Sequence, residues 1–160
     1  MRFCWRLLLA GALAGVATTA WAQSSTRVLK VAPSADVQEL DPTRGRNLIS
    51  RIYSQMVFDT LFALDGSLSP KPMMVDRETV SEDRLTYNFT LRPSLKFHDG
   101  TAVTSRDVVA SLHRWMDGTS TGGQLKSRLA SLTANDERSF TLTLKQPFGL
   151  VEHRINQRLA

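Results

Sequence analysis

The sequence predicts an α/β fold in which helices flank a sheet, and two kinds of apolar periodicity support this class. Residues 85–92 and 140–145 alternate apolar with polar side chains, as a strand with one buried face does. Residues 47–61 and 104–117 repeat apolar side chains every three or four positions, which is typical of a helix with one apolar face. The two strands are each expected to need a partner, so we predict that they pair in one sheet.

Composition places the chain among ordinary globular proteins. Of its 160 residues, 42% are hydrophobic and 22% are charged, which argues against collagen, low-complexity disorder and a polytopic membrane protein. The formal net charge is +5, but the basic residues do not gather with stacking aromatic residues. A nucleic-acid partner is therefore not expected.

The first 22 residues have the pattern of a secretory signal. Arg2 and Arg6 precede an uncharged stretch over residues 7–19, and Ala20-Trp21-Ala22 supplies a small-x-small cleavage site. The alternative is a membrane anchor, but the apolar stretch barely reaches the ~20 residues that a spanning helix needs. We expect cleavage after Ala22 and a soluble periplasmic protein. Cleavage removes Cys4, the only cysteine, so the exported part can form neither a disulfide nor a thiolate metal site.

The exported part begins with a predicted strand and a predicted helix. Val28–Ala32 is a short apolar run ended by Pro33, and we expect it to be a buried first strand. The helix is predicted from Asn47, a plausible N-cap, to Leu61. Its expected apolar face consists of Ile49, Ile52, Tyr53, Met56 and Val57.

Turn signals separate the predicted elements. Asp65-Gly66 marks a turn, and residues 69–74 are expected to be extended or loop. Residues 81–84 are expected to form a hairpin turn that leads into the first alternating strand. Residues 135–137 supply another turn before the second alternating strand.

The region between the two alternating strands carries a loop and a second helix. Asp99-Gly100 suits a tight turn within residues 97–101. Thr104 and Asp107 have the spacing of a capping box at the start of a helix that ends at Asp117-Gly118. Its apolar side is formed by Val108, Leu112, Trp115 and Met116.

Catalytic and metal-binding motifs are not evident in the sequence. His98, His113 and His153 lack the spacing of a zinc protease, and no cysteine pair completes a site. The sequence contains no G-x-S-x-G elbow, and Gly122-Gly123 lacks the lysine of a phosphate loop. We therefore expect no enzymatic activity, no metal and no cofactor.

The chain carries an ordered set of motifs, of which the most specific is Leu-Arg-x-x-x-Lys-Phe-His-Asp-Gly at residues 91–100. The set also includes Leu40-Asp41-Pro42, Tyr87 to Arg92, and Asp107-Val108-Val109 with Ser111 and Arg114. In this set the chain resembles the peptide-type, or family 5, solute-binding proteins of ABC importers. The resemblance implies two α/β lobes that close over a solute and present it to a permease and ATPase complex. It implies that this chain is an incomplete part of the first lobe, with a mixed sheet and flanking helices.

The resemblance also implies roles for individual residues. Arg46, Asn47 and Leu48 would lie beside the ligand, in the loop after Leu40-Asp41-Pro42. The other motif residues would be architectural, with Phe97 packed, Asp99-Gly100 in a turn and Thr104 at a helix cap. The full set of structural motif residues comprises Asp41, Pro42, Phe97, His98, Asp99, Gly100, Thr104 and Asp107.

Several alternatives remain open from the sequence. Within the family the solute could be a peptide, a nickel complex or an opine. Outside it, the chain could be a small exported enzyme or an interaction module that shares only this segment. We expect a signal peptide at 1–22, a lobe segment at 23–151 and a divergent end at 152–160. That end is interpreted as a frameshift or a gene fragment, with a deliberate single-lobe product as the alternative.

Overall fold

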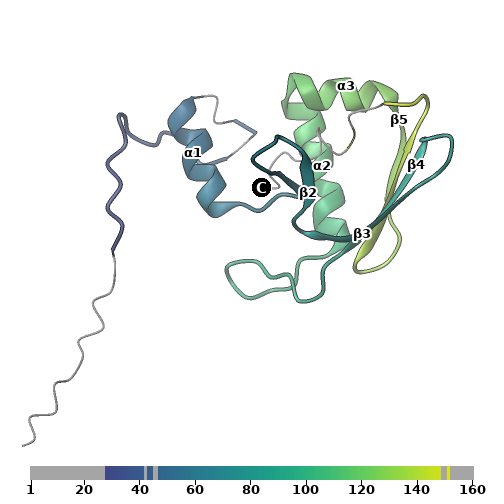
Figure 1. The fold of residues 1–160 in the computed structure, drawn as a ribbon, viewed down its shortest axis with the longest axis horizontal. Helices are drawn as coiled ribbons and strands as arrows, with labels where there is room; N and C mark the ends of the chain where they lie inside the picture. Colours follow the sequence, from purple (N-terminus) through teal and green to yellow (C-terminus); the bar gives the residue numbers. More distant parts are fainter. Residues whose placement is uncertain (1–27, 42, 45–46, 149–150, 152–160) are drawn as a thin grey trace, which may run out of the picture. The chain divides into compact units, whose positions relative to one another are not determined.

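A computed structural model describes residues 28–41, 43–44, 47–148 and 151 of the chain (Figure 1). The predicted signal peptide and the predicted divergent end lie outside these residues, as do Pro42 and Arg46. The chain divides into one unit up to Ala32 and another from Pro33 onward.

The expected first strand is the clearest error of the sequence analysis. Residues 28–32 adopt no strand, and the side chains of Val28, Leu29 and Val31 are exposed. A strand is stable only where a neighbour satisfies its backbone groups, and none of the described residues pairs with this segment.

The second unit contains three helices and six strands among its described residues. In chain order they are α1 (Leu48–Val57), β1 (Phe62–Leu64), β2 (Pro70–Pro72), β3 (Val75–Val80), β4 (Thr86–Leu91), α2 (Ser105–Gly118), α3 (Ser120–Arg128), β5 (Leu129–Ala134) and β6 (Ser139–Leu144). The α/β class with flanking helices is confirmed. All strand pairs in the described residues are antiparallel, so the mixed sheet expected from the resemblance is not seen in this part of the chain.

The two strands predicted from alternation are the neighbouring central strands of the larger sheet. Its order is β3-β4-β6-β5, and Phe89 of β4 lies opposite Phe140 of β6. Their rings stack with centroids 4.9 Å apart, and both side chains are buried. The expected hairpin turn at 81–84 joins β3 to β4, and the expected turn at 135–137 lies between β5 and β6.

Both outer strands of this sheet carry irregularities. The register between β3 and β4 shifts between Val75 and Arg77, and the register between β5 and β6 shifts between Leu129 and Ser131. β3 also exposes Asp76 and Arg77 to solvent. Neither β3 nor β5 was predicted from the sequence.

Helix α2 covers the core beside β5 and β6 (Figure 1). The predicted capping box is present, since the Asp107 carboxylate accepts a hydrogen bond from the Thr104 backbone N–H at 2.8 Å. The predicted apolar side is also confirmed, because Val108, Leu112, Trp115 and Met116 are all buried.

Helix α3, which the sequence analysis did not predict, follows α2 after a single residue and packs closely on it. A Cβ atom at Gly122 would lie 2.5 Å from the Trp115 carbonyl oxygen and 2.6 Å from the Met116 Cα. A glycine at this position therefore allows the two helix backbones to approach one another. Gly123 has open space around it.

Candidate functional site

The segment that leads to the predicted ligand residues is anchored on α2. The Asp41 carboxylate accepts hydrogen bonds from the Thr43 backbone N–H at 2.9 Å and from the Thr43 hydroxyl at 2.7 Å. It also forms an ion pair with the Arg114 guanidinium of α2. Two motif residues that are 73 positions apart in the sequence thus meet directly.

The ionised form of Asp41 is favoured in this arrangement. Partial burial raises the pKa of Asp41, but the hydrogen bonds from Thr43 and the charge of Arg114 outweigh it, so the pKa lies below its ordinary value. Arg114 is half-exposed and Asp41 is mostly buried. The ion pair and the hydrogen bonds from Thr43 therefore hold the Asp41 carboxylate between Thr43 and α2.

An open hollow of about 510 Å³ lies next to this anchor. It is lined by Thr43, Arg44, Arg114, Asp117 and Gly118. The Thr43 Cβ lies 3.7 Å from the position a Cβ would take on Gly118, so the anchored segment lies against the C-terminal end of α2.

Two of the three predicted ligand residues belong to the start of α1. The Asn47 side chain accepts a hydrogen bond from the Ser50 backbone N–H at 2.7 Å, so the predicted N-cap is confirmed. Leu48 is 69% exposed and presents an apolar side chain to solvent. Arg46 lies outside the described residues. The ligand role of these three residues stays a prediction.

The C-terminal part of α1 departs from the sequence analysis. The helix ends at Val57 and not at Leu61, and Leu61 is instead fully buried at the entry to β1. The expected apolar face is only partly buried, since Ile49 and Tyr53 are half-buried while Ile52 and Met56 are exposed. The fully buried residues of the helix are Ser50 and Ser54. The periodicity therefore located the apolar side chains of the helix, but it did not predict which of them are buried.

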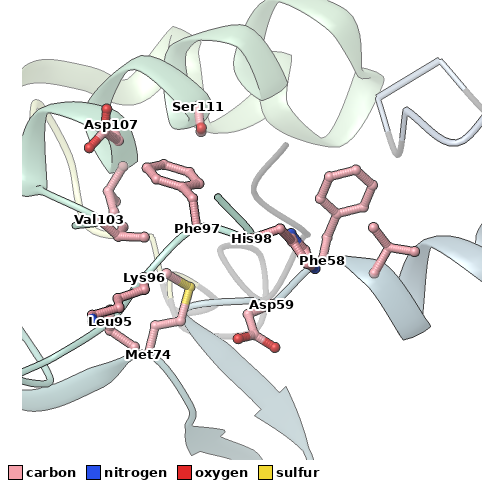
Figure 2. A pocket seen from close by; sticks show the side chains of 12 residues that line it. Phe58, Asp59, Met74, Leu95, Lys96, Phe97, His98, Val103, Asp107 and Ser111 are labelled. Carbon is pink, nitrogen blue, oxygen red and sulfur yellow. The ribbon is translucent and has the colours of Figure 1, made fainter. Parts of the chain in front are cut away.

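A second hollow, of about 180 Å³, gathers several of the motif residues around an apolar lining (Figure 2). Figure 2 shows Phe58, Met74, Leu95 and Phe97 around it, together with polar side chains from the same segments. The polar members are Asp59, Lys96, His98, Asp107 and Ser111. Apolar cavities of about 150 Å³ accept a molecule the size of benzene, so this hollow can hold one apolar side chain.

The loop before α2 has the predicted turn but not the predicted packing. The Asp99 carboxylate accepts hydrogen bonds from the Thr101 hydroxyl and backbone N–H, which lower the pKa of Asp99, and Gly100 has a φ of +87°. The turn at Asp99-Gly100 is therefore confirmed. Phe97 is 46% exposed, so its expected packing is wrong. The Phe97 side chain lines the open hollow, and no described residue covers this side chain fully.

The described residues form neither a metal-binding cluster nor a membrane-spanning helix. They contain no group of three or more His, Cys, Asp or Glu side chains that could hold a metal ion. No helix among them is long and apolar enough to cross a bilayer.

The chain shares its fold with solved structures of proteins that hold small ligands. The chain superposes on Listeria monocytogenes OppA bound to peptide with a TM-score of 0.69, 20% identity, and coverage of 78% of this chain and 28% of OppA. It superposes on AgaA of A. tumefaciens R10 in complex with agropinic acid with a TM-score of 0.70, 26% identity, and coverage of 79% and 26%. The fold is therefore that of an extracellular solute-binding protein.

The sequence comparisons specify the family. Residues 69–159 match the sequence model of "Bacterial extracellular solute-binding proteins, family 5 Middle", and the chain belongs to this family. It is 38% identical over 144 residues to the probable peptide ABC transporter periplasmic-binding protein y4tO of Sinorhizobium fredii, covering 89% of this chain and 27% of that protein. It is 31% identical over 139 residues to the glutathione-binding protein GsiB of Escherichia coli K12, covering 84% and 27%. The chain thus spans about a quarter of the length of these relatives.

The family assignment agrees with the resemblance deduced from the motifs. One of these relatives is named as a probable periplasmic-binding protein of a peptide ABC transporter and the other as a glutathione-binding protein. Phe58, Asp59 and Met74 were not predicted as neighbours of the loop at 97–101, although they line the same hollow. Their contact depends on how distant segments meet, and no local pattern in the sequence encodes it.

Proposed function

We propose that the chain supplies part of the first lobe of a periplasmic solute-binding protein that delivers peptides or similar small solutes to an ABC importer. The observation that carries this proposal is the 38% identity to a probable peptide ABC transporter periplasmic-binding protein. The GsiB relative supports the same solute class, because glutathione is itself a peptide. The partners would be the membrane permease and its ATPase, and residues 1–22 would direct export to the periplasm.

The ligand would lie against the start of α1. Asn47 is held by its capping hydrogen bond, and the Arg114 ion pair holds Asp41 on α2. Leu48 would then offer an apolar contact to the solute, with Arg46 beside it in the sequence. A solute that touches both lobes stabilises the closed state over the open state, and this difference drives its capture.

The chain by itself provides one wall of such a site. A solute bound to one wall leaves many of its polar groups in water and buries little surface. We therefore expect this chain alone to bind peptides no more tightly than about 1 mM, which corresponds to roughly 4 kcal/mol.

A chimera tests the function at full length. Residues 28–148 of this chain replace the matched segment of the y4tO protein, and calorimetry measures binding of dipeptides, tripeptides, glutathione, a nickel–histidine complex and an opine. Micromolar binding of one or more of the peptides is expected. Exclusive binding of the nickel complex or the opine would replace the peptide proposal, and no binding by a folded chimera would overturn it.

Variants of the chimera test the ligand residues. Leu48→Ala and Arg46→Glu are each expected to weaken peptide binding about tenfold, which corresponds to about 1.4 kcal/mol. Leu68→Ala is the matched control, because Leu68 is 70% exposed and lies in the β1–β2 turn. Equal effects of Leu48→Ala and Leu68→Ala would contradict the assignment.

A further inference from the structure

The loop before α2 holds Phe97 in an ordered backbone although the side chain of Phe97 is 46% exposed. The Phe97 N–H donates to the Thr101 carbonyl at 2.9 Å, and the Phe97 carbonyl accepts from the Gly100 N–H at 2.9 Å. The Val103 N–H donates to the Leu95 carbonyl at 3.0 Å, which closes the loop at its base. The ring is therefore held at the surface by the backbone, and its exposure does not come from an irregular loop.

The other wall of the 180 Å³ hollow is equally ordered. The Phe58 N–H donates to the Ser54 carbonyl at 2.9 Å at the end of α1. The Met74 N–H donates to the Thr60 carbonyl at 3.2 Å, and Met74 is buried. Figure 2 shows the rings of Phe58 and Phe97 apart from one another among the side chains that line the hollow. The hollow is therefore formed before anything binds, as ligand sites usually are.

The size and the lining of the hollow fit one aromatic ring. Its volume of about 180 Å³ is close to that of apolar cavities that accept benzene. The rings of Phe58 and Phe97 favour an aromatic guest over an aliphatic one, because ring pairs gain stabilisation beyond the burial of area. The thioether of Met74 adds a group that makes favourable contacts with aromatic rings.

Charges of both signs lie among the lining residues. Asp59 and Lys96 both line the hollow, and no ion pair joins either of them to another described residue. Asp107 lines it too, but its carboxylate caps α2 by accepting from the Thr104 N–H at 2.8 Å. Asp59 is thus available for an ammonium group and Lys96 for a carboxylate. An apolar ring that carries both of these groups is an aromatic α-amino acid in its zwitterionic form.

We infer that this hollow is a binding site for a free aromatic α-amino acid. The ring of the amino acid lies between Phe58 and Phe97. Its ammonium group pairs with Asp59, and its carboxylate pairs with Lys96. Residues 46–48 do not line the hollow, so this site is separate from the peptide site proposed above. The inference goes beyond the proposed function, which does not require a second site.

Four small probes test the chemistry of the site on the full chain. Chemical-shift titration measures the binding of L-phenylalanine, phenylpropionate, phenylethylamine and L-alanine, of which the last three lack the ammonium group, the carboxylate and the ring. L-phenylalanine is expected to bind with a dissociation constant on the order of 1 mM, as suits a ligand of about a dozen heavy atoms. Phenylpropionate and phenylethylamine should each bind roughly two- to fivefold more weakly, because each loses one solvent-exposed ion pair. L-alanine should bind at least about tenfold more weakly, because it buries no ring.

Two variants assign the site to the hollow. Phe97→Ala should weaken the binding of L-phenylalanine at least about tenfold, because one aromatic wall is lost. Asp59→Asn should weaken the binding of L-phenylalanine roughly two- to fivefold and leave that of phenylpropionate unchanged, whereas a merely structural effect would weaken both. Leu68→Ala and Asp76→Asn are the matched controls, because both residues are exposed and neither lines the hollow.

The same titration on the chimera described above shows whether the site exists at full length. Binding of L-phenylalanine by the chain and by the folded chimera, lost in both on Phe97→Ala, supports the inference. Equal binding of L-phenylalanine and L-alanine, an equal effect of Leu68→Ala, or a folded chimera that does not bind L-phenylalanine would overturn it. Peptide binding by the chimera is measured separately and depends on Leu48 and not on Phe97. Failure of the peptide proposal and failure of this inference are therefore distinguishable.

Discussion

Replacement of Gly122 by alanine should open the contact between α2 and α3. The new Cβ would meet two backbone atoms, the Trp115 oxygen at 2.5 Å and the Met116 Cα at 2.6 Å, and neither can rotate away. It would also lie 2.8 Å from the Thr119 hydroxyl oxygen, which accepts the hydrogen bond from the Gly122 N–H that caps α3. Helix α3 must therefore shift, and the cap is strained by the same movement.

The magnitude follows from two opposing effects. Insertion of a methyl group into close-packed structure costs about 1–3 kcal/mol. Exchange of glycine for alanine inside a helix returns up to about 1 kcal/mol. We therefore expect Gly122→Ala to lower the free energy of unfolding by about 1–2 kcal/mol, which is roughly a factor of 5–30 in the unfolding equilibrium.

Urea unfolding of the chain from Gln23 measures this effect. Trp115 is the only tryptophan in that chain, it is buried, and it lies at the contact being disturbed, so its fluorescence reports unfolding directly. Gly123→Ala is the matched control, because nothing lies within 4 Å of its added Cβ. That variant should be neutral or up to about 1 kcal/mol more stable. Equal stability of the two variants would refute the close approach of α3 to α2.

Three further predictions concern the start of α1 and the aspartates. Asn47→Ala should lower the free energy of unfolding by about 1 kcal/mol because the helix cap is lost, whereas Asn47→Asp should retain most of the stabilisation by the cap. Urea titration of both variants measures this difference. A double-mutant cycle of Asp41→Asn and Arg114→Gln should give a coupling energy of about 0.5–1 kcal/mol, and a coupling of zero would deny the ion pair a stabilising role. Five aspartates have a lowered pKa because hydrogen bonds favour their ionised form, so their contribution to stability is complete above about pH 4 and is lost as the pH falls further. The urea midpoint should therefore be lower at pH 3 than at pH 7. An unchanged midpoint would contradict the lowered pKa values of these aspartates, which are Asp41, Asp65, Asp83, Asp99 and Asp136.

The elements that were predicted correctly carry a strong local signal. Strands β4 and β6 alternate without interruption, and α2 has both a capping box and a stripe of four buried apolar residues. The elements that were missed lack such a signal. In β3 only Val75 is buried, and α3 contains two adjacent glycines and buries only Gly122 and Leu125. These elements exist because neighbouring elements hold them in place.

The errors at 28–32 and in α1 have a common physical reason. A pattern of apolar residues shows which side of a segment avoids water, but it does not show which other segment covers that side. The same limit applies to the site. The Asp41–Arg114 ion pair depends on a tertiary contact between residues 73 positions apart. The motifs therefore included both residues but did not predict that they form an ion pair.

The irregular outer strands also determine how this sheet can grow. A fifth strand, from another chain or a fibril, needs a straight row of free backbone groups on β3 or β5. The register shift at Val75–Arg77 bends the backbone of β3, and the register shift at Leu129–Ser131 bends the backbone of β5. The exposed charges of Asp76 and Arg77 further oppose the stacking of strands at the β3 edge. Accordingly, when copies of this chain stick together at high concentration, they should do so as amorphous clusters formed through helix side chains and not as ordered cross-β fibrils.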